Sequence, residues 1–333
     1  MTHTIQKDPP PADPSRFDAG RLRRLGSRAL QQYGIVLVCL ALFILLTTTS
    51  DVFLSQRNMT NILDQWSVAG MIACAGTFVL ICGGFDLSVG AMFALSGVVC
   101  ALVAEHTGSA VLAVVCGIAA GCVIGLVNAI AFTVFGINAL ITTLATALIT
   151  TGIAIYISGG QLVTITDPNL LQLGQGRFLN ITYPGWALVI TVALTWFVLS
   201  RTKFGYHVFA VGGNLEAARL SGVRVRLVRS TTFVMSGALC GIAGVLAASR
   251  IGTGQADVGA ELPLLVISAI VVGGTSIYGG EGAIWRTFLG ILLFAMIGNG
   301  FTLLGVNPQI QQVVQGLILL GAVGLDSISR LRT

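Results

Sequence analysis

Long stretches without Asp, Glu, Lys or Arg dominate the chain, and eight of them approach or exceed the length of a membrane span. They cover residues 29–50, 65–85, 87–104, 107–166, 178–200, 230–249, 262–280 and 287–325. A transmembrane helix needs about 20 mostly apolar residues. The fourth and the last stretch are each long enough for two helices, with turn-forming Gly, Asn and Pro near 136–138 and 305–308. The pattern predicts an all-α polytopic membrane protein with about ten transmembrane helices.

Composition agrees with this fold class. Hydrophobic residues make up 55% of the chain and charged residues only 9%, against roughly 25% charged residues in a soluble protein. A soluble domain of this size needs a charged surface, whereas a bilayer accepts an apolar one. Small residues crowd 117–125 and 237–247, which predicts helices that pack with their backbones close together. We therefore expect one transmembrane domain over residues 29–333.

The basic residues predict the orientation of the chain in the membrane. They gather in the polar segment 1–28, in the loop 201–229 and at the C-terminus, where Arg330 and Arg332 lie. An even number of spans puts these three segments on one side, and the positive-inside rule makes that side cytoplasmic. Residues 1–28 are thus expected to form a cytoplasmic polar tail, with both chain termini in the cytoplasm. The net charge of +5 is explained by topology, so no nucleic-acid partner is expected.

No enzyme motif is present in the sequence. Its two lysines, Lys7 and Lys203, follow Gln and Thr, so neither fits the Gly-Lys-[Ser/Thr] end of a phosphate-binding loop. The three histidines are far apart, and the seven cysteines all lie in apolar stretches as packing residues. We expect no catalytic residue, no metal site and no cofactor bound by this chain.

Asp86 is the clearest polar residue at membrane depth. It lies between two apolar stretches and follows Gly83 and Gly84, which favour a break in the helix. Ionisable residues within the membrane are costly and indicate function, and broken helices build binding sites in many transporters. Asp86 could equally cap the helix that follows, and both roles stay open.

Further polar residues indicate a possible path for a neutral, hydroxyl-rich solute. Asn138, Thr142 and Thr146 follow one another at helical i, i+4, i+8 spacing. The alternative role for each is hydrogen bonding between helices. The candidate path residues are Asp86, Ser88, Asn128, Asn138, Thr142, Thr146, Glu261 and Asn299.

The cytoplasmic loop 201–229 is expected to contain a short helix. Asn214 is a good N-cap, the following Ala-Ala-Arg-Leu favours a helix, and Gly222 can end it. A helix between two spans could pass motion from a soluble partner to the membrane, although an ordinary loop helix would have the same sequence.

Several strings in this chain resemble those of the ribose-type ABC importer permeases. Residues 83–90 read Gly-Gly-Phe-Asp-Leu-Ser-Val-Gly, and residues 212–222 read Gly-Gly-Asn-Leu-Glu-Ala-Ala-Arg-Leu-Ser-Gly. Glycine-rich residues 272–282, then Asn299-Gly300 and Gln315-Gly316, follow in the order and spacing of that family. The resemblance extends from about residue 33 to 327.

The resemblance implies a permease subunit of the bacterial inner membrane. Its expected partners are a second permease (a copy or a paralogue), a cytoplasmic subunit that binds ATP and Mg, and a periplasmic or lipid-anchored sugar-binding protein. It also implies that the loop helix couples to the ATPase subunit. The residues matching the family's coupling loop are Gly212, Gly213, Asn214, Glu216, Ala217, Ala218, Arg219, Leu220, Ser221 and Gly222.

Two other functions remain open from the sequence. One is an ABC permease of the same fold that carries another small solute, such as a nucleoside or an amino acid. The other is an ion-coupled secondary transporter with Asp86 as its coupling site, which would not need an ATPase at the loop helix.

Overall fold

The computed structural model describes residues 34–331, and the predicted tail 1–28 and Arg332 lie outside them. The described chain is mostly helical, and its helices are Gly34–Thr49, α2 (Gln56–Ile81), α3 (Val89–Thr107), α4 (Ala110–Thr133), α5 (Ala139–Ser158), α6 (Pro168–Gln175), α7 (Tyr183–Arg201), α8 (Lys203–Gly213), α9 (Leu215–Leu220), α10 (Val225–Ile251), α11 (Leu262–Val272), α12 (Ile284–Leu303) and α13 (Pro308–Leu331). Two antiparallel two-residue pairs complete it: β1 (Val163–Thr164) with β4 (Thr253–Gly254), and β2 (Arg177–Phe178) with β3 (Ile181–Thr182).

Seven helices are long and apolar enough to cross a membrane, namely α2, α3, α4, α5, α7, α10 and α12. Helix Gly34–Thr49 and α11 are apolar but shorter. The predicted span 262–280 is helical only over its first 11 residues, about 16 Å against the roughly 30 Å of a bilayer core. It stops because Gly273 and Gly274 begin a turn in which Gly274 has φ +88°. The membrane-protein class is confirmed, whereas the count of ten spans stays a prediction.

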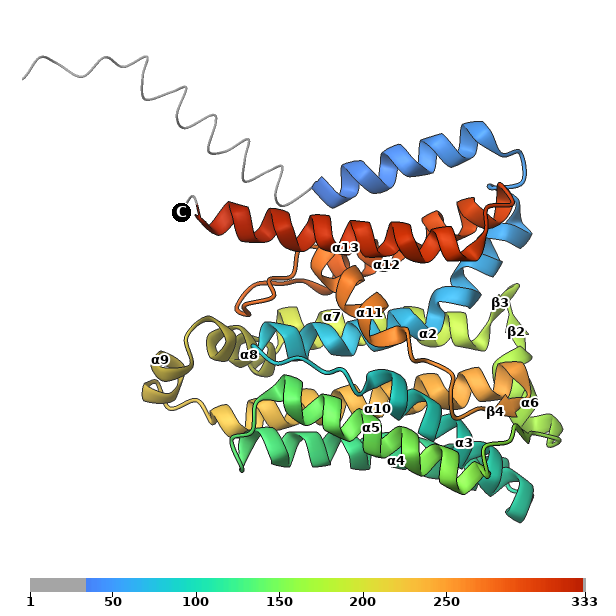
Figure 1. Ribbon diagram of the computed structural model, residues 1–333, viewed down its shortest axis with the longest axis horizontal. Helices are drawn as coiled ribbons and strands as arrows, with labels where there is room; N and C mark the ends of the chain where they lie inside the picture. The colour runs from blue at the N-terminus through green and yellow to red at the C-terminus, as the bar shows by residue number, and fades with distance from the viewer. Residues whose placement is uncertain (1–33, 332–333) are drawn as a thin grey trace, which may run out of the picture.

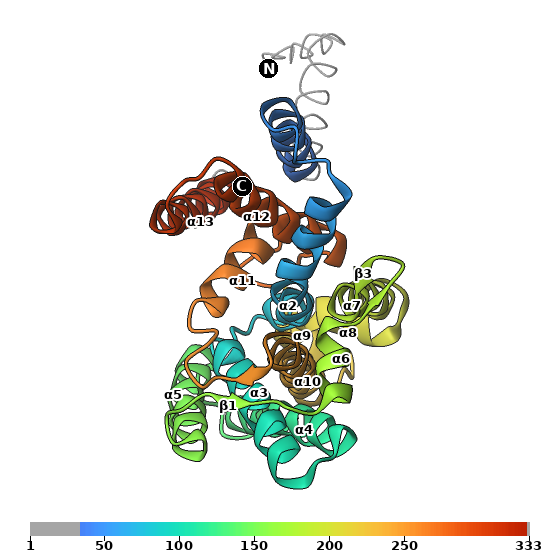
Figure 2. The ribbon, with the colours of Figure 1, turned by 90° about the vertical axis from the view of Figure 1, so that its right-hand side faces the viewer.

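Helices α2 and α10 form the centre of the bundle (Figure 2). Helix α10 contacts α2, α3 and α4, and α2 also contacts α7, α11 and α12. Both central helices are largely buried within the chain, whereas most residues of α4 and α5 are exposed or only partly buried. Many apolar side chains at the periphery of the bundle are therefore not covered by other parts of the protein. A surface that faces lipid allows this.

Glycines set the close crossing of α4 and α10. A Cβ atom on Gly121 would lie 2.4 Å from the Gly237 carbonyl oxygen, and one on Gly237 would lie 2.3 Å from the Gly121 oxygen. One turn further, a Cβ on Gly125 would lie 2.6 Å from the Phe233 oxygen. The predicted close approach through small residues is confirmed here, because any larger side chain would hold the two helices apart.

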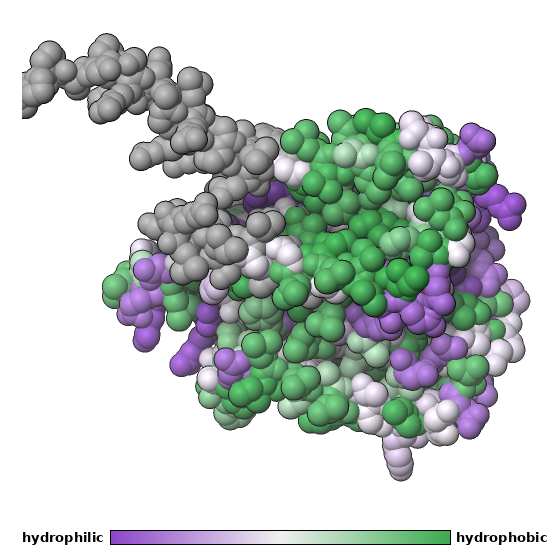
Figure 3. Space-filling view, turned by 45° about the horizontal axis from the view of Figure 1, so that its top comes forward, coloured by the Kyte–Doolittle hydropathy of each residue, from purple (hydrophilic) through white to green (hydrophobic). Residues whose placement is uncertain are grey.

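Most helices run along one direction, so the bundle has two ends (Figure 1). We call one the α9 end, where α8, α9 and the loop 273–283 lie, and the other the hairpin end, with α6, β1–β4 and the β2–β3 hairpin. Helix Gly34–Thr49 starts, and α13 stops, on the side of the α9 end (Figure 1). On the face shown in Figure 3, the surface between the ends is broadly hydrophobic, and hydrophilic residues gather mostly toward the ends.

Candidate functional site

Asp86 lies in the non-helical break between α2 and α3, and its carboxylate is buried. One carboxylate oxygen accepts hydrogen bonds from the Ser88 backbone N–H at 3.0 Å and from the Ser88 hydroxyl at 2.6 Å. The other accepts from the Ser236 hydroxyl of α10 at 2.7 Å. Helix α3 begins after Ser88, so Asp86 stabilises the turn before the helix and is not its N-cap residue. Three donors offset the cost of burying the carboxylate.

The hydrogen bonds continue from Ser88 into α4 and α5. The Asn128 side-chain amide donates to the Ser88 oxygen at 2.8 Å, and the Thr146 hydroxyl donates to the Asn128 carbonyl at 2.6 Å. The side chains of all five residues in this network of hydrogen bonds are buried, namely Thr146, Asn128, Ser88, Asp86 and Ser236. The structure thus brings together four of the predicted path residues as one chain of amide, hydroxyl and carboxylate groups. We call this chain, formed by Asp86, Ser88, Asn128, Thr146 and Ser236, the Asp86 network.

The other predicted path residues lie outside the Asp86 network. Thr142 is buried on α5, and its hydroxyl has no hydrogen-bond partner among the residues that the structure describes. Asn138 is exposed and caps α5 through the Leu140 N–H, at 2.9 Å. Glu261 is also exposed and accepts a hydrogen bond from Gln312 at 2.6 Å.

Asn299 pairs with Asn58, joining α12 to α2. Their side-chain amides exchange two reciprocal hydrogen bonds of 3.0 and 2.8 Å, and Asn58 also donates to the Phe53 carbonyl at 2.9 Å. This geometry supports the helix-packing alternative considered for such residues, since the Asn58 side chain is buried.

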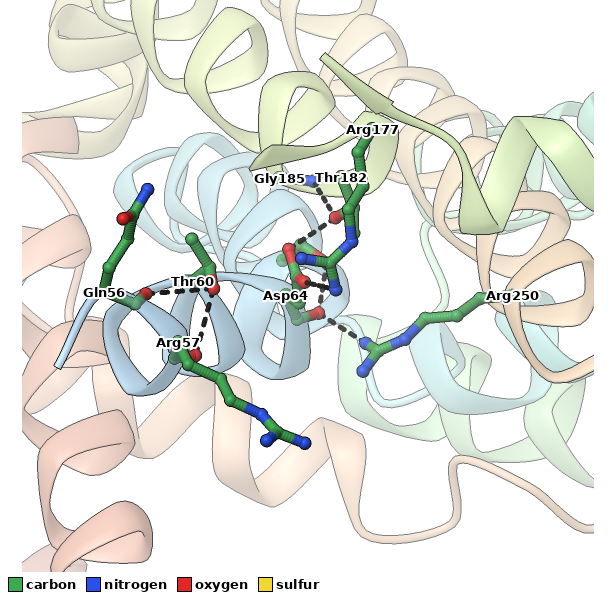
Figure 4. A network of polar contacts seen from close by, with 9 residues as sticks. Gln56, Arg57, Thr60, Asp64, Arg177, Thr182, Gly185 and Arg250 are labelled. Atoms are coloured by element: carbon green, nitrogen blue, oxygen red, sulfur yellow. Dashed lines mark hydrogen bonds and ion pairs between the residues drawn. The ribbon is translucent and has the colours of Figure 1, made fainter. Parts of the chain in front are cut away.

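A second buried carboxylate, Asp64 of α2, lies toward the hairpin end (Figure 4). It accepts a hydrogen bond from the Thr182 hydroxyl at 2.5 Å and forms an ion pair with Arg177 at 3.7 Å. Its backbone carbonyl accepts from Arg250 of α10 at 2.6 Å and from Ser67 at 2.8 Å. These contacts join α2, the β2–β3 hairpin and the end of α10 at a single position.

Charged residues delimit the spans predicted from the sequence. The stretch 65–85 begins immediately after Asp64, so this aspartate falls outside the predicted span. In the structure α2 starts at Gln56, so Asp64 lies two turns inside the helix. The sequence does contain a signal for the start of α2, because Ser55 is a good N-cap residue. In the structure its side chain accepts a hydrogen bond from the Asn58 N–H.

We expect Asp64→Ala to destabilise the protein by about 1–3 kcal/mol, because the buried Thr182 hydroxyl would lose its acceptor. Arg177→Ala is the control, since 53% of the Arg177 side chain is exposed and an exposed ion pair contributes roughly 0–1 kcal/mol. Thermal unfolding in detergent measures both variants. Equal stability losses would contradict the assignment of the main contribution to the Thr182 contact.

The predicted loop helix is present as α9. The Asn214 side chain accepts the Ala217 N–H at 2.9 Å and so caps it, and Gly222, with φ +82°, follows its end. The Ala218 side chain is buried against the core at the α9 end, while Gly212 is half-buried. The rest of the predicted coupling residues are exposed: Gly213, Asn214, Glu216, Ala217, Arg219, Leu220, Ser221 and Gly222. The helix thus presents a mixed surface of charged and apolar side chains at the end of the bundle, and Ala218 is its buried contact.

An apolar cavity of about 300 Å³ lies between helix Gly34–Thr49, α2, α7 and α12. Its lining is almost entirely apolar and includes Phe43, Trp66, Leu188 and Phe288. A sugar has hydroxyl groups that would lose their hydrogen bonds to water without finding partners there. The cavity is therefore a poor sugar site, and the polar groups of the bundle lie elsewhere. Within residues 34–331, no three His, Cys, Asp or Glu side chains gather to hold a metal ion.

Comparison with known proteins gives a match to one family model over residues 58–323. That family is described as "Branched-chain amino acid transport system / permease component". The L-arabinose ABC transporter permease protein AraH of Azospirillum brasilense is 40% identical over 90% of this chain and 89% of its own length. The ribose import permease protein RbsC of Bacillus subtilis is 36% identical over 89% of this chain and 93% of its own. No solved structure gives a significant match.

Proposed function

This chain belongs to the permease-component family of the branched-chain amino acid transport systems, and from that premise we propose that it carries a sugar or related polyol through the membrane. It is a multi-pass permease subunit of an ABC importer of the inner membrane, and the ATPase is a separate subunit.

The observation that carries the choice of cargo is the near-full-length similarity to permeases named for L-arabinose and ribose. Sugars are neutral and rich in hydroxyl groups. The amides and hydroxyls of the Asp86 network can exchange hydrogen bonds with such groups, which supports the choice. An amino acid or a nucleoside is less well supported, because these relatives are named for sugars. The ion-coupled alternative is not favoured either, since the relatives belong to ABC importers.

We propose that the path passes beside the break between α2 and α3. Asp86, Ser88, Asn128 and Thr146 form a connected polar group there, and the Thr142 hydroxyl on the same helix as Thr146 has no partner within the described chain. A free buried hydroxyl can accept or donate to a passing solute. Asn138, Glu261 and Asn299 remain candidate path residues outside this group.

We also propose ten membrane segments with the α9 end in the cytoplasm. Helix Gly34–Thr49, α11 and α13 would complete the seven long spans. Helix α11 would cross together with its extended flanks, which is tolerated where the backbone is surrounded by protein. Basic residues at the α9 end support the orientation. They are Arg201, Lys203, Arg219, Arg224, Arg226 and Arg229.

The proposed assembly pairs this permease with a second copy or a paralogue. The ATPase subunit, which binds ATP and Mg, would contact α9. The sugar-binding protein would approach the hairpin end, because that end is opposite α9 (Figure 1).

Reconstitution tests the proposed function. The permease in liposomes should import radiolabelled L-arabinose, ribose or a related polyol only when its ATPase subunit, its binding protein and ATP are all present. The matched sample lacks ATP and has a proton or sodium gradient instead. Uptake driven by the gradient alone, or ATP-driven uptake of leucine without any sugar, would overturn the proposal.

A further inference from the structure

Three backbone segments that are far apart in the sequence meet at the α9 end. They are the end of α2, the end of α8 and the loop 273–283. The Gly280 N–H donates a hydrogen bond to the Ile81 carbonyl at the end of α2, at 2.9 Å. A Cβ on Gly212, near the end of α8, would lie 1.7 Å from the same Ile81 oxygen and 2.7 Å from the Gly280 nitrogen. We call this contact the Ile81–Gly212–Gly280 junction.

The contacts between the three segments of the junction are made by main-chain atoms, so no change of rotamer can release them. Gly279 and Gly280 have φ values of +86° and +76°, a left-handed conformation that glycine adopts without strain. A Cβ on Gly280 would lie 2.9 Å from the Gly213 Cα, and one on Gly279 would lie 3.0 Å from the Ile81 oxygen. Side-chain contacts can slip by changing rotamers, but main chains in direct contact must move together.

The junction lies between α9 and the break that holds Asp86. On one side, Gly212 is two residues before Asn214, the cap of α9. On the other, Ile81 is the last residue of α2, and the non-helical break follows it directly. Arg229 of α10 holds the start of the break, because its guanidinium donates to the Cys82 carbonyl at 3.4 Å.

We propose that the Ile81–Gly212–Gly280 junction transmits the movement of α8 and α9 to the break between α2 and α3. Gly212 and Gly280 are then positioning residues for translocation, since they act through the backbone of Ile81 on the Asp86 network. This inference rests on the proposed function, in which α9 receives the ATPase subunit. The junction adds the route by which a movement of α9 reaches the polar groups of the proposed path.

The test is Gly212→Ala in the assembled transporter. We expect the ATPase subunit to co-purify and to hydrolyse ATP as with wild type, while sugar import per ATP falls by about tenfold, a typical scale for coupling between sites. Gly152→Ala on α5 is the matched control, because a Cβ there meets nothing within 4 Å. Import at the wild-type rate, or import and hydrolysis that fall in proportion, would overturn the inference.

A charge-reversal variant separates this inference from the proposed function. Glu216→Lys combined with Arg219→Glu changes the exposed face of α9 without touching the junction, so it should abolish co-purification with the ATPase subunit. If the ATPase subunit still co-purifies, the proposed role of α9 is wrong. If co-purification is lost and Gly212→Ala remains fully coupled, only the junction inference is wrong.

A measurement on the wild-type complex covers the case in which Gly212→Ala does not fold. Hydrogen exchange of residues 82–88 and 279–282 is followed with and without a nonhydrolysable ATP analogue. We expect both segments to change their exchange rates together when the analogue binds. A change at α9 with none in residues 82–88 would overturn the inference.

Discussion

Asp86→Ala is expected to abolish sugar import and to lower the stability of the folded protein. The change removes the acceptor of three hydrogen bonds, two from Ser88 and one from Ser236. These groups are buried, and water cannot replace the lost acceptor without opening the bundle. We expect a loss of about 3 kcal/mol or more, at roughly 1 kcal/mol for each buried donor left unpaired.

Two further variants show which property of Asp86 matters. Ser236→Ala removes a single donor to the carboxylate, so it should cost about 1.5–3 kcal/mol, less than Asp86→Ala. Asp86→Asn keeps a carbonyl oxygen for Ser88, and its amide can donate to the Ser236 hydroxyl, so we expect it to fold and to import without a new pH dependence. Thermal unfolding in detergent and ATP-driven uptake measure these effects. If Asp86→Ala were as stable as wild type, the network would not be the stabilising element described here.

Gly121→Leu should separate α4 from α10 and prevent the bundle from closing. The new Cβ would lie 2.4 Å from the Gly237 oxygen and 3.0 Å from the Gly241 Cα. Both contacts are with backbone atoms of α10, so no neighbouring side chain can move aside. The cost is expected to be at least the roughly 3 kcal/mol at the upper end of ordinary overpacking.

Ala119→Leu on the same helix is the matched control, because Ala119 is exposed on the other face of α4. It adds the same kind of side chain where apolar surface meets lipid. The fraction of each variant that elutes as a single species after detergent extraction reports folding. A Gly121→Leu protein as well folded as Ala119→Leu would contradict the close crossing of α4 and α10.

Local features of the fold could be predicted from the sequence because they depend on neighbouring residues. The capped helix α9 is present as expected between Asn214 and Gly222. The break at Asp86 is likewise present, because Gly83 adopts a left-handed conformation, with φ +76°, just after the end of α2. The length of α11 was predicted wrongly, because an apolar stretch does not reveal that Gly274 turns the chain.

The site was predicted less completely, since a polar residue does not reveal its partner. Asn299 was a candidate for the path, yet it pairs with Asn58, 241 residues away. Asp64 falls outside the predicted span because a charged residue marks the end of an apolar stretch. Its burial depends on Thr182 and Arg177, which reach it from a hairpin more than one hundred residues later.

The sequence by itself determined that this chain is a helical membrane protein, where its longer helices lie, and which strings resemble an importer permease. These properties follow from hydropathy, capping and glycine positions within a few residues of one another. Only the tertiary structure decided which groups meet: Asp86 with Ser236, and Gly212 with Ile81 and Gly280. The physical reason is that such contacts depend on how closely whole helices approach. That distance is set jointly by surfaces from distant parts of the chain, and no local segment contains it.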